Sequence, residues 1–138
     1  MDNNRSIVDH DCSGRWGVIL AGGDGKRLLP LTRKLTGEDR PKQFCALSGT
    51  DTLLKETWQR VSHVVPQPNI LLVLTRTHER FYVDQVHGIP TCNLLVQPYN
   101  RGTAPAIVYS LTRLKSVAPN DLLASFARII ISRTMGLW

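Results

Sequence analysis

Short apolar runs alternate along this chain with longer segments in which apolar residues recur at helical spacing. The runs that have the length of a buried strand are residues 16–21, 70–75, 94–96 and 122–126. The segments with helical spacing are residues 51–65, 76–87 and 103–117. Strands that alternate with helices in this way are typical of βαβ units. The pattern therefore predicts an α/β fold with a mostly parallel sheet and helices on both faces.

The predicted helices carry boundary signals. Asp51 or Thr52 can cap the start of the first helix, which we expect to end before Pro66. Trp58 falls at core spacing within it, so we interpret this residue as core before any stacking role. The expected apolar face of the last helix consists of Ala106, Ile107, Leu111, Leu114 and Val117.

Residues 22–50 contain five glycines, two prolines and six Lys or Arg residues, and they show no sustained apolar period. We expect a long, mostly irregular connection, and long connections inside compact domains are often functional. In parallel α/β sheets, ligands bind at the carboxyl ends of the strands. The residues that directly follow the first strand are therefore the first place to look for a site.

These residues read Leu-Ala-Gly-Gly-Asp-Gly-Lys-Arg-Leu from Leu20 to Leu28. Glycines let a backbone bend sharply and bring its N–H groups close to phosphate oxygens, and two cations follow at once. A Walker A loop would need a glycine at Leu20 and a hydroxyl residue at Arg27, and a dinucleotide fingerprint would need a third glycine at Leu28. The loop is thus predicted to bind phosphate without matching either common motif.

Composition narrows the partner and the compartment. The net charge of +6 suits an anionic partner without choosing among nucleotides, sugar phosphates, nucleic acid and acidic lipid. No apolar run approaches the roughly 20 residues of a spanning helix, and residues 1–15 lack the apolar region of a secretory signal. We expect residues 1–15 to be a disordered tail. Cys12, Cys45 and Cys92 form no CxxC pair, which disfavours a disulfide framework or a zinc site and favours the cytoplasm.

Further motifs follow the glycine loop in order. They are Pro30-Leu-Thr32, Arg40-Pro-Lys-Gln-Phe44, Gln97-Pro98 and the segment Asn-Arg-Gly-Thr-Ala-Pro-Ala-Ile at residues 100–107. This series resembles the sugar-1-phosphate nucleotidyltransferases, and among them the mannose-1-phosphate guanylyltransferase branch. The resemblance extends over residues 16–126. It implies a Rossmann-like sheet of the nucleotidyltransferase type, of which this chain holds the N-terminal part and is therefore incomplete.

The resemblance also implies a nucleotide-binding site. Ala21, Gly22 and Gly23 would contact the base and ribose through backbone groups. Gly25 and Lys26 would lie over the triphosphate.

The same resemblance implies catalytic roles for Arg27, which would stabilise charge on the phosphates, and for Lys42, which would hold the phosphate of the sugar or the α-phosphate. Gln97 and Gly102 would help to select the base. Two positions depart from the family pattern, since Lys26 replaces the usual Thr or Ser and Gly102 replaces the Asn common in the guanylyl branch. The second departure leaves the choice of base open.

The implied reaction is the attack of a sugar 1-phosphate oxygen on the α-phosphorus of an NTP, which yields an NDP-sugar and pyrophosphate. GTP and GDP-mannose are the expected nucleotide and product. Such in-line transfers depend on positioning and on cations that face the developing charge, so no Ser or Cys nucleophile is needed. His63, His78 and His87 are accordingly interpreted as surface or packing residues.

The family binds Mg²⁺ through an aspartate that follows its fourth strand, but no carboxylate occurs here after Asp121. Codons for residues 127–136 can be chosen that read Ser-Asp-His-His-Phe-Ser-Asp-Asp-Gly in a shifted frame. We therefore hypothesise that residues 127–138 are a frameshifted tail and that the metal ligand is missing. We expect the chain alone to be inactive, and an exposed sheet edge to favour self-association.

Two alternatives stay open. A small nucleotide-binding or regulatory module could use the same loop without catalysis. A basic nucleic-acid-binding protein would bind with a steep salt dependence, although the acidic residues Asp24, Glu38 and Asp39 among the cations oppose it. We expect no specific nucleic acid partner and no membrane partner.

Overall fold

The computed structural model describes residues 14–126, and within them four parallel strands form one sheet. The strands are β1 (Arg15–Leu20), β2 (Ile70–Thr75), β3 (Leu94–Gln97) and β4 (Leu122–Phe126). Their spatial order is β3-β2-β1-β4, and β1 pairs in parallel with both β2 and β4. The chain therefore builds the sheet outward in one direction from β1 to β3, and then crosses back to place β4 on the other side of β1.

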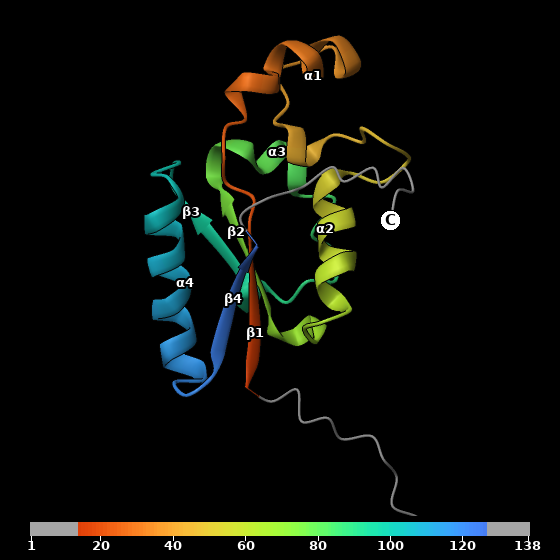
Figure 1. Ribbon diagram of the computed structural model, residues 1–138. Coiled ribbons are helices and arrows are strands. Elements are labelled where there is room, and N and C mark those ends of the chain that lie inside the picture. The colour runs from red at the N-terminus through yellow and green to blue at the C-terminus, as the bar shows by residue number, and fades with distance from the viewer. Residues whose placement is uncertain (1–13, 127–138) are drawn as a thin grey trace, which may run out of the picture.

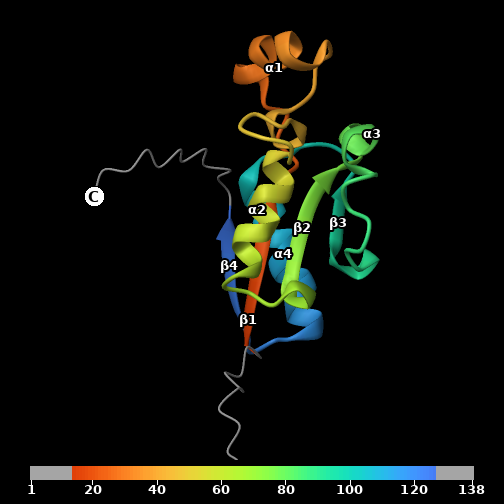
Figure 2. The same ribbon diagram turned by 90° about the vertical axis from the view of Figure 1, so that its right-hand side faces the viewer.

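Helices cover both faces of the sheet, as the sequence predicts (Figure 1). The helices are α1 (Leu29–Thr36), α2 (Leu53–Ser62), α3 (Glu79–Tyr82) and α4 (Thr103–Val117). The short 3-10 turns are Lys26–Leu28, Lys42–Phe44, Gln67–Asn69, Arg76–His78 and Thr91–Asn93. Helix α2 packs on one face and α4 on the other, while α1 projects beyond the carboxyl ends of the strands (Figure 2).

The core lies in two layers, one on each face of the sheet. Alternate residues of β2 point to opposite faces, so Leu72 and Leu74 pack with α2 and the aromatic residues near α3, whereas Leu71 and Val73 pack toward α4. All six residues of β2 are buried, which is the burial expected of a central parallel strand. The strand prediction is correct for all four strands within one residue at each end.

The prediction that residues 22–50 are mostly irregular is wrong for residues 29–36, which form α1. Pro30 lies in the first turn of α1, and the amide of Gly37 caps the end by donating to the Arg33 carbonyl at 2.8 Å. These boundary signals were present in the sequence. The apolar period was not, because α1 projects from the sheet and leaves Leu31 and Leu35 exposed.

Two helices are shorter than predicted. Helix α2 ends at Ser62, and Val65 reaches the core from the turn that follows. The predicted helix at residues 76–87 is a 3-10 turn followed by α3, which ends at Tyr82. Beyond Tyr82 the chain continues in turns, from which Val86 and Ile89 pack against the core without a helix.

The predicted apolar face of α4 is only partly correct. Ala106 and Leu114 are buried, but Leu111 and Val117 are about half exposed. The buried row runs instead through Ser110, whose hydroxyl donates to the Ala106 carbonyl at 2.8 Å. A small hydroxyl residue fits here because its polar atom is satisfied within the helix.

Strand β1 starts at Arg15, so the predicted tail reaches at most Gly14. The rest of that tail and the hypothetical frameshifted tail at residues 127–138 lie outside the described residues. Both hypotheses therefore stay predictions.

Candidate functional site

A cavity of about 190 Å³ opens at the carboxyl ends of β1, β2 and β3. The residues that line it are Leu20, Gly22, Gly23, Val73, Gln97, Asn100, Gly102, Thr103 and Ala106. Four of the nucleotide-binding residues proposed from the sequence, namely Gly22, Gly23, Gln97 and Gly102, are among them. The fold thus brings the segment after β1 and the segment after β3 to one cavity.

The β1 loop, which we define as residues 21–25, is fixed through its carbonyl groups. Gln43 Nε2 donates to the carbonyls of Ala21 and Gly23 at 3.0 and 2.7 Å, and the Thr75 hydroxyl donates to that of Gly22 at 2.8 Å. The amides of residues 22–25 donate no hydrogen bond to any other described residue. These amides therefore remain available to an acceptor on a ligand, as in backbone sites that bind anions.

Gly22 lies too close to β2 for a side chain. A Cβ at this position would lie 2.7 Å from the Thr75 hydroxyl oxygen and 3.8 Å from Gln97 Oε1. Thr75 is completely buried and uses the same hydroxyl to hold the Gly22 carbonyl, so it has little room to move. Glycine is therefore required here by close packing against the neighbouring strand.

Gly102 is the N-cap residue of α4 and lines the cavity. Its φ of 93° and ψ of −179° are in a region that is essentially restricted to glycine. Its amide donates to the Asn100 side chain at 2.9 Å, and Thr103, the first residue of α4, lines the cavity. Glycine at position 102 therefore permits the sharp turn by which the chain enters α4, and the N-terminal end of this helix faces the cavity.

The segment that carries Lys42 packs beside the β1 loop. A Cβ on Gly25 would lie 3.5 Å from the backbone nitrogen of Lys42. Lys26, Arg27 and Lys42 form no ion pair with any residue in the part of the chain that the structure describes. The structure therefore brings the two candidate catalytic segments together and leaves their cations available, although Gly25 and these cations do not line the cavity itself.

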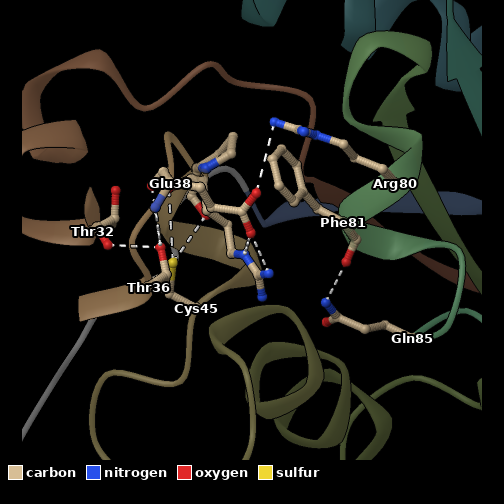
Figure 3. Close-up of polar contacts among 9 residues, drawn as sticks. Thr32, Thr36, Glu38, Cys45, Arg80, Phe81 and Gln85 are labelled. Carbon is tan, nitrogen blue, oxygen red and sulfur yellow. Dashed lines mark hydrogen bonds and ion pairs between the residues drawn. The ribbon is translucent and has the colours of Figure 1, made fainter. Parts of the chain in front are cut away.

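Residues of α3 contact the part of the chain that precedes Lys42, as the pair of Arg80 and Glu38 shows (Figure 3). Glu38 accepts from the Arg40 guanidinium at 2.6 Å and lies 3.8 Å from that of Arg80. Both guanidinium groups lie over the Phe81 ring, at 5.3 Å and 4.4 Å from its centroid. The Cys45 thiol donates to the Arg40 carbonyl, and burial raises the pKa of this thiol. The segment is consequently held in place by groups that take no part in the cavity.

Ala21 is placed differently from the other proposed residues. It is buried, its amide donates to the Val73 carbonyl at 2.9 Å, and its carbonyl accepts from Gln43. Both backbone polar groups are thus already used inside the protein.

Sequence reasoning missed Gln43, Asn100 and Thr103 as site residues. Gln43 belongs to a motif that was recognised, but only the structure shows that its amide spans to the β1 loop. Asn100 and Thr103 flank Gly102 in sequence, and a search of the residues around a proposed helix start could have found them.

The described residues do not form a ready metal site. No Asp or Glu lines the cavity, and no group of three His, Cys, Asp or Glu side chains within residues 14–126 could hold an ion. Magnesium prefers carboxylate and phosphate oxygens, so this part of the chain does not by itself fit the ion.

No helix among residues 14–126 is both long enough and apolar enough to span a bilayer.

The sheet, its helices and the loop after β1 together define an α/β nucleotidyltransferase-like fold. Residues 16–126 match the nucleotidyl transferase family, and the chain belongs to this family. The matched range coincides with the range of the resemblance found in the sequence.

Two similar proteins have known names. The chain is 38% identical over 109 residues to the alginate biosynthesis protein AlgA of Pseudomonas aeruginosa, which covers 77% of this chain and 21% of the relative. It is 44% identical over 96 residues to mannose-1-phosphate guanylyltransferase 2 of Escherichia coli O157:H7, which covers 67% of this chain and 19% of the relative. The chain thus spans about a fifth of the length of these relatives.

A solved structure from Thermus thermophilus, described as a mannose-1-phosphate geranyltransferase, superposes with a TM-score of 0.67 at 32% identity. The similarity covers 83% of this chain and 32% of that one. The fold assignment therefore has support from both sequence and structure.

Proposed function

We propose that this chain is the nucleotide-binding part of a transferase that makes an NDP-sugar from an NTP and a sugar 1-phosphate. GTP and mannose 1-phosphate are the proposed substrates, because two of the similar proteins are named for mannose 1-phosphate. The observation that carries the proposal is the β1 loop, whose amides at residues 22–25 have no acceptor among the described residues.

The cavity and its surroundings support a division of the site. A volume of about 190 Å³ is small beside the roughly 300–1,000 Å³ of typical ligand pockets, so we assign it to the base and ribose. Gln97 and Gly102 then lie on the side of the base, together with Gly22 and Gly23. The triphosphate extends toward Gly25, Lys26 and Arg27, beyond the cavity.

In the proposed reaction a sugar 1-phosphate oxygen forms a bond to the α-phosphorus while the bond from that phosphorus to the pyrophosphate oxygen breaks. Negative charge develops on the phosphoryl oxygens and the leaving group. Arg27 and Lys42 can offset that charge, since neither has a carboxylate partner among the described residues. The ordering of the loops supplies the positioning that such a transfer requires.

Mg²⁺ would supply charge neutralisation at the phosphates when it is bound. We propose that the chain alone forms no GDP-mannose, because it spans about a fifth of its relatives and its sequence has no Asp or Glu after Asp121 that could serve as the expected metal ligand. We also propose a cytoplasmic location and self-association through the open side of β4. Formation of GDP-mannose by the purified 138-residue protein would contradict the proposed inactivity.

The proposal is tested by nucleotide-dependent thermal stability. A ligand that binds only the folded state raises the melting temperature, by an amount that corresponds to about 2.7 kcal/mol at 100 times its dissociation constant. We expect GTP to stabilise the protein more than the other NTPs, and Lys42→Met to weaken its binding about tenfold, because a charge-assisted contact to phosphate is lost.

The matched control is Lys34→Met, which removes the same charge from an exposed position on α1. It should leave the GTP shift unchanged. Equal losses in both variants, or no shift with any NTP, would contradict the proposal. Binding of RNA or DNA with a steep salt dependence and no nucleotide preference would favour the nucleic-acid alternative.

A further inference from the structure

The β1 loop contains a carboxylate, Asp24, although a negative charge is unfavourable in a loop that binds phosphate. Asp24 lies between Gly23 and Gly25, and the free amides of residues 22–25 include its own. A carboxylate at this position repels an approaching phosphate by Coulomb's law. Its presence therefore calls for a compensating role.

Both oxygens of the Asp24 side chain have partners from other loops. Oδ1 lies 3.4 Å from His78 Nε2, in the turn that follows β2. Oδ2 accepts from Asn100 Nδ2 at 3.3 Å, in the connection between β3 and α4. Asn100 in turn accepts from the amide of Gly102 through its own Oδ1. One carboxylate thus connects the segments that follow three neighbouring strands.

The environment of His78 explains why it needs Asp24. The residue is only 8% exposed and lies against the aromatic rings of Phe44 and Phe81, with ring centroids 5.9 and 6.5 Å away. Nδ1 is buried and has no hydrogen-bond partner in the described structure. A neutral imidazole carries one donor and one acceptor, and a proton on Nε2 is the arrangement that places the N–H on the side of the Asp24 carboxylate, 3.4 Å away. The carboxylate is the group toward which that proton can point.

We propose that Asp24 is a positioning residue, which holds the β1 loop in register with the His78 turn and with the Asn100 segment that lines the cavity. It does so without touching the nucleotide. The expected effect on nucleotide binding rests on the proposed function, whereas the contacts of Asp24 do not depend on it. The two contacts also turn the Asp24 carboxylate toward its partners. Solvent partly screens the repulsion between this carboxylate and the phosphates of the nucleotide. In this proposal, the ordering of the β1 loop outweighs that repulsion.

The first test does not depend on any ligand. Nitrogen chemical shifts of the His78 ring, measured by NMR, are expected to report a proton on Nε2 in the native chain. Asp24→Ala should change the ring's tautomer balance and speed hydrogen exchange at the Gly102 amide, although residue 102 is far from the substitution in sequence. Asp24→Asn, which keeps an oxygen acceptor, should restore part of both signals.

The matched control is Asp39→Ala, which removes an exposed carboxylate paired with Arg33 on the α1 side. It should alter neither signal. If Asp24→Ala and Asp39→Ala give the same His78 shifts and the same Gly102 exchange, the positioning role is wrong. Should Asp24→Ala fail to fold, Asp24→Asn is the test, because its side chain offers one oxygen to the two partners in place of two, and native values of both signals in this variant would overturn the proposal.

The second test measures GTP affinity by calorimetry in the same variants. Positioning predicts that Asp24→Ala binds GTP about tenfold more weakly and that Asp24→Asn lies between it and the native chain. If the carboxylate acted only by repulsion, both variants would bind more tightly, and this result would overturn the proposal. If the native chain binds no nucleotide, the proposed function fails, and the NMR result alone decides the role of Asp24.

Discussion

Single side chains decide how closely the segments around the cavity approach one another. Gly22 has no space for a Cβ beside Thr75, whereas a Cβ on the adjacent Gly23 would have no atom within 4 Å. Two neighbouring glycines that look equivalent in the sequence therefore have different reasons to be glycine. The first is required by packing, and the second leaves the backbone accessible.

This difference gives a prediction at Gly22. Gly22→Ala should lower the free energy of unfolding by about 1–3 kcal/mol, because the added methyl group overpacks a buried hydroxyl. Gly23→Ala is the control and should change the stability by much less. Urea unfolding of both variants measures the effect, and equal stabilities would show that the Thr75 contact relaxes freely.

His78 provides a prediction for pH. Burial lowers the pKa of its imidazole, with a smaller opposing effect from Asp24, which is the charged group that faces the ring. In the unfolded chain, the His78 imidazole therefore binds a proton near the ordinary pKa of about 6.5, while in the folded chain the imidazole stays neutral to lower pH. Stability should be full above that value and should fall as the pH decreases toward the lowered pKa.

Urea unfolding between pH 5.5 and 7.5 measures this dependence. His78→Gln should flatten it, because the titrating group is gone. His63→Gln, at an exposed position, should keep the native slope. A slope that persists in His78→Gln would assign the pH dependence to other groups.

At the scale of elements, short helices are held by their ends and by contacts with neighbours. The Thr52 side chain accepts from the Lys55 amide at 3.3 Å and caps α2, as its position in the sequence predicts. The same hydroxyl donates to Gln85 Oε1, and Gln85 donates to the Phe81 carbonyl in α3. One residue therefore caps a helix and joins it to the turns after α3.

Loss of this hydroxyl should be measurable. Thr52→Ala is expected to lower the free energy of unfolding by about 1 kcal/mol, the usual effect of removing an N-cap oxygen. Thr52→Ser keeps the oxygen and should retain most of the stability. Chemical denaturation of the two variants separates the hydroxyl from the methyl group, and equal losses would show that the cap contributes little.

At the scale of the molecule, exposed apolar residues occur on β4 and on α4. Leu122 on β4 is 75% exposed, Val108 on α4 is 61% exposed, and β4 pairs only with β1 among the described strands. A strand edge that has no partner and carries an exposed apolar residue can pair with another chain. This is the surface through which self-association is proposed.

Leu122→Lys should therefore reduce the association of the chain at micromolar concentrations, as measured by sedimentation velocity. A lysine on an edge strand opposes pairing because its charge would be buried. Leu35→Lys makes the same change on α1, at the other end of the molecule (Figure 1), and should have no effect. Equal behaviour of the two variants would exclude β4 as the contact.

The sequence by itself determined the strands, the parallel α/β class and the family. Continuous apolar runs and ordered motifs are local signals. The apolar run of a buried strand can be recognised in the sequence without knowing which strands lie beside it. The wrong predictions at α1 and α4 share a cause, because the burial of these helices depends on their position relative to the sheet and not on their own period, whereas α3 differs in length. Leu111 and Ser110 illustrate this, since the apolar residue is exposed and the hydroxyl is buried.

Only the tertiary structure decided which residues meet. Gln43 reaches the β1 loop across 22 positions of sequence, and Asp24 reaches Asn100 across 76. Such contacts depend on the order of the strands in the sheet, and no local pattern encodes that order. The sequence thus specifies the pieces of the site, whereas the crossing of the chain over β1 specifies their arrangement, because parallel strands bring their carboxyl ends to one edge.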